Sequence, residues 1–369
     1  MSIAPATIAI APLRVPTALD ADDAGDFLLL AELTRRICDL DAGIPDLAPS
    51  AAELLPPWQD STDAVDLGFV ARRDDEVVGM VTLSFAQEEG SRVAEFDLLV
   101  LPEHAGTGVE EALLAVVDEE ARNRGRTSLQ TWTLHRPLTA EQREDGSALI
   151  PATGWGRVSR SRLSTLLDAA GFRLEQVERN SEFDLRSDPA PLQALLDEAL
   201  AAAGPDYRAV RWILPTPPEH RDGYAAILAR LSTDAPHGEL EIVAEEWDES
   251  RLTRRETRLA EAGRLMSVAA VVHEPTGTIA AYNELVIGAD RAELTHQFGT
   301  LVHADHRGHR LGTIVKCVNL LAWPGIAPQS PAVSTFNAEE NRPMLDINER
   351  IGFTAVSYAA AWQKTLPVT

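Results

Sequence analysis

The chain has 369 residues, of which 45% are hydrophobic, and a formal net charge of −24. This length exceeds what one ordinary domain needs, so two domains are expected, and the negative charge, spread along the sequence, argues against nucleic acid or an anionic membrane as partner. Two cysteines predict neither a disulfide framework nor a zinc site. No apolar run approaches the roughly 18 residues of a membrane span, and the sequence does not begin with a basic region before an apolar core, so we expect no membrane span and no secretory signal. These observations together predict a cytoplasmic protein.

The first half of the chain begins with a predicted hairpin. Residues 69–72 and 77–85 have the pattern of strands around an acidic turn at 74–76. A strand at 96–101, a loop at 102–108 and a helix at 109–122 follow, and then a short strand at 128–133. A helix at 163–170 ends at Gly171-Phe172, since glycine is a common helix stop, and a strand at 173–185 closes the half. The polar segment 137–156 is expected to be a surface loop or lid.

The second half repeats this plan about 200 residues later. Its predicted elements are a hairpin at 268–272 and 278–287, a strand at 292–302, a loop at 303–310, a helix at 311–321, a strand at 332–337, a helix at 344–351 before Gly352-Phe353, and a strand at 354–363. Matches in the same order at a similar offset favour a duplication. We therefore expect an N-terminal domain at 1–187 and a C-terminal domain at 188–369, separated where prolines and polar residues break the structure at 186–191.

The most informative segment is the loop before the helix of the second half. It reads His306-Arg307-Gly308-His309-Arg310-Leu311-Gly312-Thr313. A strand that turns through such a loop into a helix leaves amide donors unpaired at the positive end of the helix dipole, which favours phosphate. The loop lacks the Gly-Lys-Ser/Thr ending of a P-loop, and its glycine spacing does not fit a Rossmann fingerprint. We expect a phosphate-bearing ligand of another kind.

These residues resemble the Gcn5-related N-acetyltransferase (GNAT) superfamily. The central motif of that superfamily, Arg/Gln-x-x-Gly-x-Gly/Ala at the start of a helix, is matched here at Arg307 and Gly312 and departs at Arg310. A second shared feature is an Asn-containing segment, here Asn337 and Asn341, before a helix that ends in Gly-Phe. The two-domain arrangement is similar to tandem superfamily members of the mycothiol synthase type.

The resemblance implies an α/β fold with two GNAT-like domains, each a mixed, mostly antiparallel sheet flanked by helices, and acetyl-CoA as acyl donor. Loop amides would hold its pyrophosphate, and a bulge in the fourth strand would let the pantetheine arm pair with the backbone. Arg310 either hinders close approach or adds a phosphate contact, and we favour the second. The asparagines either contact the cofactor or cap and turn the backbone. The implied cofactor residues are Leu301, Val302, Arg307, Gly308, His309, Arg310, Leu311, Gly312, Thr313, Asn337 and Asn341.

Catalytic residues are carried over by position. The general base of family members often lies on the fourth strand, about 11 residues before the motif, and this count reaches His296, whose imidazole suits neutral pH. Glu293, Gln297 and Glu284 are alternatives. The position of the usual acid, a tyrosine, holds Asn348, which can hydrogen-bond a thiolate but cannot donate a proton to it. Tyr282 and Tyr358 are the alternatives there.

The corresponding loop of the first half differs in charge. It reads Ala105-Gly106-Thr107-Gly108-Val109-Glu110, without the leading Arg or Gln, and Glu110 would face the phosphates and oppose anion binding. Thr133 stands where the second half has Asn337. We therefore expect the N-terminal domain to bind no acetyl-CoA and to serve as a scaffold and as one wall of the acceptor cleft.

The expected function is an acyl-CoA-dependent N-acetyltransferase. It would move an acetyl group from acetyl-CoA to a small-molecule primary amine by direct attack in a ternary complex, in the C-terminal domain of a monomer or homodimer. Because the tyrosine is missing, the alternative is a non-catalytic acyl-CoA-binding or structural protein derived from such an enzyme.

Overall fold

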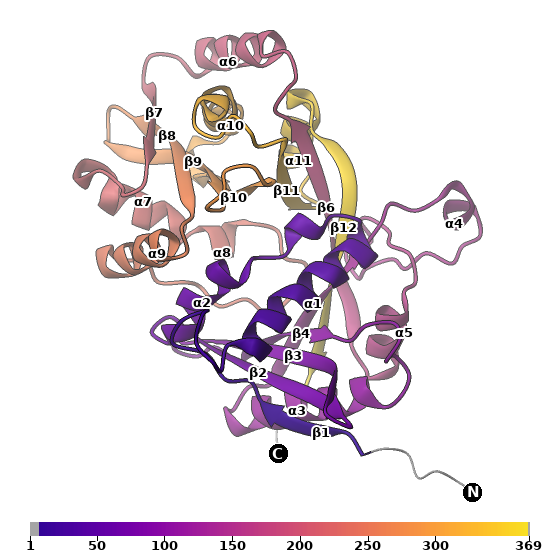
Figure 1. Ribbon diagram of the computed structural model, residues 1–369. Helices are drawn as coiled ribbons and strands as arrows, with labels where there is room; N and C mark the ends of the chain where they lie inside the picture. Colours follow the sequence, from indigo (N-terminus) through magenta and orange to yellow (C-terminus); the bar gives the residue numbers. More distant parts are fainter. Residues whose placement is uncertain (1–6, 368–369) are drawn as a thin grey trace, which may run out of the picture. The chain divides into compact units, whose positions relative to one another are not determined.

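The computed structural model describes residues 7–367, which form two compact units (Figure 1). The first unit contains the chain up to His135, Arg160–Glu175 and the residues from Ala360 onward. The second unit contains Arg136–Ser159 and Gln176–Ala359. Each unit combines a mixed sheet with helices, so the α/β fold expected from the sequence is confirmed.

The first unit is built on strands in the order β1-β2-β3-β4-β5-β12. Pairing is antiparallel from β1 to β4, and β4 then pairs in parallel with β5 over Val93 to Glu95. The elements of this unit are β1 Ala9–Pro12, α1 Gly25–Ala42, η1 Pro45–Leu47, α2 Ala51–Gln59, β2 Ala64–Arg73, β3 Glu76–Ala86, β4 Val93–Leu99, α3 Val109–Asn123, β5 Ser128–His135 and α5 Arg162–Ala169, with the start of β6 Arg173–Asp184 and the end of β12 Thr354–Thr365.

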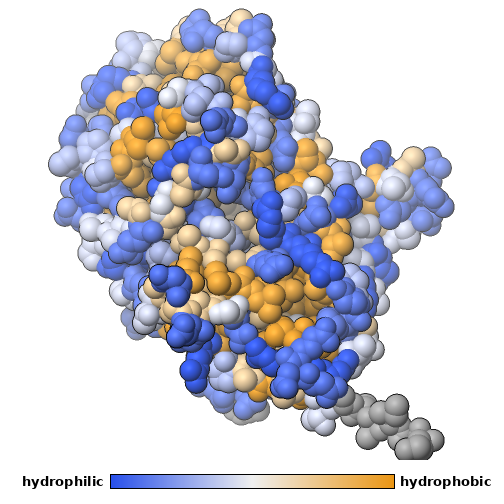
Figure 2. Space-filling view, in the orientation of Figure 1, coloured by the Kyte–Doolittle hydropathy of each residue, from blue (hydrophilic) through white to orange (hydrophobic). Residues whose placement is uncertain are grey.

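Helices cover both faces of this first sheet. Phe27 and Leu30 of α1 pack with Val70, Met80 and Leu99 of the strands in one apolar cluster. On the other face, α3 approaches β3 so closely that a side chain at Gly79 would meet Val109 and Leu113 of α3. Figure 2 shows apolar residues between hydrophilic ones over α1, where Leu28 and Leu40 are exposed.

The second unit has the strand order β12-β6-β11-β10-β9-β8-β7. Pairing is antiparallel from β7 to β10 and between β11 and β6, while β10 and β11 run parallel. Its elements are α4 Ala140–Glu144, most of β6, α6 Ala190–Ala203, β7 Tyr207–Ile213, η2 Pro218–His220, α7 Arg221–Leu228, α8 Leu231–Asp234, α9 Glu249–Glu261, β8 Leu265–His273, β9 Thr278–Ile287, β10 Thr295–Val302, η3 Ala304–His306, α10 Leu311–Ala322, η4 Trp323–Gly325, β11 Ala332–Ala338, α11 Arg342–Ile351 and the start of β12.

Two apolar clusters separate the faces of the second sheet. On one face, Leu311 and Ile314 of α10 and Leu196 of α6 pack with Leu285 of β9 around the fully buried Trp323. On the other face, α7 and α9 cover the sheet, with residues such as Tyr224 and Leu252. Paired residues on neighbouring strands share a face of the sheet. A residue of β9, β10, β11 or β6 therefore points to α7 and α9 when the residue paired with it does so.

The predicted elements of both halves are confirmed, with bounds that differ by a few residues. The strand expected at 292–302 begins at Thr295, because Asp290 accepts the amide of Ala292 in a turn (2.9 Å) and Arg291 is left-handed there (φ 59°). The expected domain boundary near 186–191 coincides with the turn between β6 and α6. The division of the chain into evolutionary halves at 187/188 remains a prediction, because compact units describe packing and not descent.

The segment 137–156 has structure of its own. It holds α4, and Leu149 bridges to Val158 just after it. Gly156 is left-handed (φ 81°) and lies so close to Val177 and Glu339 that a larger residue would collide with them. The segment is therefore anchored on the second unit, and its role as a lid remains a prediction.

Candidate functional site

The loop before α10 presents a run of unpaired backbone donors. Among the described residues, none accepts a hydrogen bond from the amides of 308–312, and the next amide, that of Thr313, donates to Arg310 O (3.0 Å). Gly308 and Arg310 both have positive φ (89° and 57°), which turns successive N–H groups towards one side. No side chain caps α10, so these donors and the helix dipole remain available to an anion.

The strands beside this loop diverge. β10 pairs with β11 only at Thr295 and His296, and from Gln297 onward β10 leaves its parallel neighbour. A register shift between Gln297 and Thr300 marks a β-bulge in β10. The expected bulge is thus present, and the backbone of Leu301 and Val302 has an open edge that an extended ligand can join.

A cavity of about 470 Å³ lies at this opening. Its walls come from the end of β10, the loop, the start of α10, the segment after α8 and the β11–α11 connection. Of the predicted cofactor residues it is lined by Leu301, Val302, Arg307, Gly308, Arg310, Leu311, Gly312 and Asn341. His309 instead packs its ring on Tyr207 (centroids 5.0 Å apart), and Thr313 and Asn337 lie outside the lining. The geometry therefore brings together most of the predicted set.

The side chain of Arg310 already has a charged partner. Its guanidinium forms an ion pair with Glu198 of α6, a carboxylate whose pKa is lowered chiefly by this contact. Arg307 is more than half exposed and lies 3.9 Å from Asp234. The preference for a phosphate contact from Arg310 remains a prediction, since such a contact requires the side chain to exchange its partner.

The asparagines form a cluster at the end of β11. Asn348 is buried, its Nδ2 donates to Asn337 Oδ1 (2.7 Å), and its Oδ1 has no partner among the described residues. Asn341 caps α11 by accepting the Met344 amide (3.4 Å) while also lining the cavity. The capping interpretation of Asn341 is therefore confirmed, and a ligand contact by the same residue is compatible with it.

The bulge is held by a buried ion pair. Glu284 of β9 receives two hydrogen bonds from Arg255 of α9 (2.8 and 2.9 Å), one from Tyr224 of α7, and one from the amide of Gly299 in the bulge (3.1 Å). Burial, the largest single influence, lowers the pKa of Arg255, but Glu284 together with Tyr224 and Tyr282 outweighs burial and raises this pKa. Because both oxygens of Glu284 are engaged, this residue is a structural support for the bulge and not a free base.

Tyr282, an alternative acid, lies beside the bulge. Its hydroxyl is buried without a hydrogen-bond partner in the described chain, and a side chain at Gly299 would overlap it. Burial, and then Glu284, raise the pKa of Tyr282 well above its ordinary value. The phenol therefore stays protonated at neutral pH.

Of the residues proposed as base from sequence, His296 lies at the start of β10 and Glu293 lies just before this strand. His296 is half-buried and pairs with Val286 of β9, which places it on the α7 and α9 face. Glu293 is exposed and precedes the strand. Neither lines the cavity, and their roles as base remain predictions.

A carboxylate pair that sequence reasoning missed lies closer to the opening. Glu178 of β6 pairs with Ala338, the last residue of β11, and Glu340 follows that strand and lines the cavity. Glu340 Oε1 accepts from Gln176 (2.6 Å), and its Oε2 is buried without a partner in the described chain. Burial and repulsion by Glu340 raise the pKa of Glu178 to about 7. Nothing in the local sequence marks Glu178, because only strand pairing brings β6 beside β11.

The corresponding loop of the first unit is closed by its own carboxylate. Gly106 and Gly108 have positive φ (71° and 88°), so the backbone path matches that of Gly308 and Arg310. Glu110 is buried, accepts the amide of Gly106 (3.1 Å) and forms an ion pair with Arg162 of α5. In addition, β4 pairs with β3 without a register shift, so this strand has no bulge of the β10 type. An anion would have to displace a carboxylate here.

Two further properties of the described residues bear on ligands and location. No helix among them combines the length and apolar character that crossing a membrane requires. No group of three or more His, Cys, Asp or Glu side chains in the described chain is arranged to hold a metal ion. Both cysteines, Cys38 and Cys317, are free and buried.

The chain is similar to known acetyltransferases in sequence and in structure. Residues 36–142 match the family model of the acetyltransferase (GNAT) family, a region that lies in the first half. No curated protein matches the chain. A tandem GNAT protein from the clavulanic acid biosynthesis pathway has a similar fold (TM-score 0.71, 24% identity), with 98% of this chain and 100% of that chain covered.

Two other solved structures are similar along nearly the whole chain. A GCN5-related N-acetyltransferase from Sphaerobacter thermophilus matches with TM-score 0.61 and 15% identity over 98% of this chain and 97% of that one. A GCN5-related glucosamine N-acetyltransferase region of a fungal multi-domain β-N-acetylglucosaminidase matches with TM-score 0.61 and 14% identity over 98% of this chain and 38% of that one. Residues 36–142 thus match the GNAT family model, and the chain shares its fold with GNAT structures along nearly its whole length.

Proposed function

We propose that the second unit transfers an acetyl group from acetyl-CoA to a small-molecule primary amine. The observation that carries this proposal is the coincidence of free amides at 308–312, an open β10 edge and a cavity between them. Amides at a helix start suit the pyrophosphate of the donor, and an open strand edge suits its extended pantetheine arm. The family-model match of residues 36–142 and the fold shared with a tandem GNAT protein support acetyl-CoA as the donor.

The reaction is a direct displacement. The neutral amine attacks the thioester carbonyl, a C–N bond forms, the C–S bond breaks, and the amine nitrogen loses one proton while the thiolate gains one. A base with a pKa near the working pH is the most effective acceptor of that proton. We assign this role to Glu178. The strand pairs His296–Ser334 and Ala338–Glu178 put Glu178 and His296 on the same face of the sheet, the one that α7 and α9 cover. The pKa of Glu178, about 7, is close to a neutral working pH.

The second candidate is a non-catalytic acyl-CoA-binding protein. It is favoured by Asn348, an amide where family members often have a tyrosine acid, and by the engagement of this amide with Asn337. Water can protonate a departing thiolate, so the lack of this acid slows transfer without abolishing it.

Release of CoA separates the two functions. Acetyl-CoA is mixed with the full chain and with a panel of polyamines, aminoglycosides, amino sugars and amino acids, and free thiol is followed with a chromogenic disulfide. We expect thiol release to accelerate with at least one amine. Tight CoA binding without release for any member of the panel would replace the proposal with the non-catalytic alternative.

A further inference from the structure

Residues 136–159, between β5 and α5, form an arm that the proposed function does not use. The arm belongs to the second unit, although the chain on both sides of it belongs to the first. In Figure 1 it extends from β6 and the start of β12, and α4 lies at its outer end. The surface of this arm is therefore a separate feature from the cavity beside the loop at 303–310.

Buried residues near both ends hold the arm in place. Leu138 near its start is 9% exposed, and Val158 near its end is 1% exposed. The left-handed Gly156 lies against Val177 of β6, without room for a side chain. Leu149 and Val158 exchange two backbone hydrogen bonds (2.8 and 3.1 Å), which close a short hairpin. The arm thus has a fixed backbone on which other side chains are displayed.

Two large apolar side chains of the arm take no part in this anchoring. Ile150 is 57% exposed and Trp155 is 50% exposed, the highest values among the large apolar residues of the described chain. The residues next to the bridged pair, Ile150 and Arg157, lie opposite each other on the other face of the hairpin, away from the buried Val158. Exposed isoleucine and tryptophan beside an arginine on a fixed backbone are typical of a protein–protein contact.

Charges of both signs lie at separate places on the arm. Glu141 and Glu144 of α4 are exposed at its outer end, and Arg157 is exposed on the hairpin. None of these three side chains forms an ion pair within the described chain. The cation of α4, Arg143, donates to the main-chain oxygen of Leu138 (2.8 Å). Such a surface is complementary to a copy of itself, because a two-fold axis sets the acidic end of each arm against the basic part of the other.

We propose that the arm joins two copies of this chain across a two-fold axis. In this dimer Ile150 and Trp155 of the two copies pack together, and Glu144 of each copy faces Arg157 of the other. The arm offers both signs of charge, which a partner of one charge would not match. Although each chain carries −24, repulsion between the copies is screened beyond about 8 Å at physiological ionic strength. The contact needs no acetyl transfer, so it goes beyond the function proposed for the second unit.

Sedimentation velocity of the full chain tests the proposal, at physiological ionic strength and over a range of chain concentrations. We expect an equilibrium between monomer and dimer. Ile150→Asp and Trp155→Asp should each weaken dimerisation by about tenfold or more, because a carboxylate replaces an apolar contact at the centre of the interface. Leu28→Asp is the matched control, since Leu28 is an apolar residue of α1 that is 42% exposed, and it should dimerise like the unchanged chain.

Reversal of charge tests the two-fold pairing itself. Arg157→Glu and Glu144→Arg should each dimerise poorly alone, because each sets like charges against one another. An equimolar mixture of these two variants should form mixed dimers, since every Glu144–Arg157 contact between the two variants then joins opposite charges.

Three results would overturn the proposal. The unchanged chain could stay monomeric at every concentration, Ile150→Asp and Trp155→Asp could dimerise as well as Leu28→Asp, or the two charge variants could fail to associate when mixed. Melting temperatures close to that of the unchanged chain verify that the variants fold. CoA release in the presence of an amine, measured on the same variants, tests the transferase proposal separately, so the two proposals can fail independently.

Discussion

The half-buried Glu178 and the fully buried Lys316 are ionisable residues whose pKa values move to about 7. For Glu178 the causes are burial and the nearby Glu340, so the carboxylate can accept a proton at neutral pH. For Lys316 the cause is burial, since its Nζ lies 5.7 Å from the centre of the Phe353 ring and has no hydrogen-bond partner in the described chain. The first shift suits catalysis, whereas the second lowers stability.

Glu178→Gln should lower kcat of acetyl transfer by roughly 100-fold, within the usual range for a general base. The base acts when deprotonated, so the rate of the unchanged enzyme should rise with pH through about 7, and this limb should be missing in the variant. Steady-state kinetics between pH 5 and 9 measure both effects. Glu182→Gln, on the same strand and face, is the control. Retention of the limb in Glu178→Gln would return the role to His296.

Lys316→Met should stabilise the protein at pH 7 by roughly 2–4 kcal/mol, because a charge in the core opposes folding. The folded pKa of about 7 lies below the model value of 10.5, so the native state binds fewer protons than the unfolded state between these values. Stability of the unchanged chain should therefore rise as the pH increases from 7 to 10, and the variant should lose this rise. Urea unfolding at several pH values measures it. Lys364→Met, at the other lysine of the chain and partly exposed, should change little.

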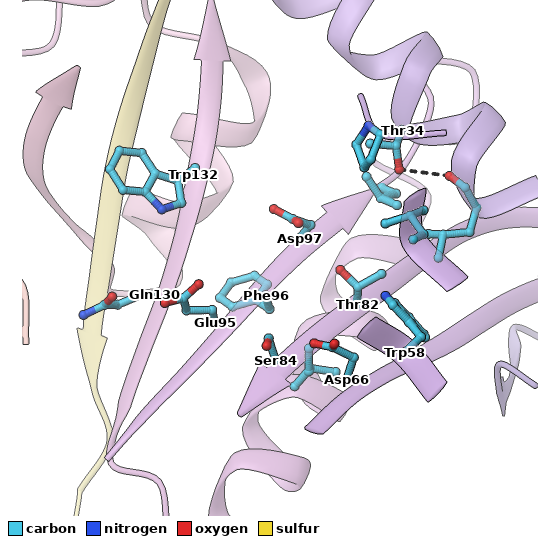
Figure 3. Close-up of a pocket in the computed structure, with 15 residues that line it drawn as sticks. Thr34, Trp58, Asp66, Thr82, Ser84, Glu95, Phe96, Asp97, Gln130 and Trp132 are labelled. Atoms are coloured by element: carbon cyan, nitrogen blue, oxygen red, sulfur yellow. Dashed lines mark hydrogen bonds between the residues drawn. The ribbon is translucent and has the colours of Figure 1, made fainter. Parts of the chain in front are cut away.

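At the scale of elements, the bulge of β10 depends on a residue without a side chain. Gly299 donates its amide to Glu284, and a Cβ at this position would overlap the Tyr282 hydroxyl. β4 of the first unit has no bulge, and its Asp97 lines a cavity of that unit (Figure 3). The bulge thus distinguishes β10 from β4, its counterpart in the first unit.

Gly299→Ala should displace Tyr282 and flatten the bulge, which closes the opening between β10 and β11. We expect acetyl-CoA affinity to fall by at least tenfold and the melting temperature to fall as well, because a buried contact becomes overpacked. Calorimetry and thermal unfolding measure the two effects. Gly325→Ala, where no atom lies within 4 Å of the added carbon, should leave both nearly unchanged. Normal affinity in Gly299→Ala would mean that the bulge does not shape the donor site.

Local signals made parts of the site predictable. The glycine and basic residues of 303–313 predicted the loop and helix start, and Glu110 predicted which loop is blocked, because these features act within a few residues of the chain. Glu178 could not be predicted. Its chemistry depends on strand pairing and burial, and an isolated glutamate in a strand has no sequence signature of either.

At the scale of the whole molecule, the two similar halves differ in the loops that precede α3 and α10. The first loop has the same left-handed positions as the second, but its amide at Gly106 is occupied by Glu110. The compact units do not follow the halves, since residues 136–159 belong to the second unit and the residues from Ala360 onward belong to the first. The sequence repeat could not predict this exchange, because a repeat records descent and not packing.

Calorimetric titration of the full chain with acetyl-CoA tests the central claim, that the free amides at 308–312 bind the donor and the Glu110 loop does not. We expect one acetyl-CoA per chain. Gly312→Glu, which places the first-half carboxylate in the second loop, should abolish binding, and Gly312→Ala, which adds only a carbon near Ile347, should retain most of it. Two acetyl-CoA per chain, or one that survives Gly312→Glu, would contradict the account.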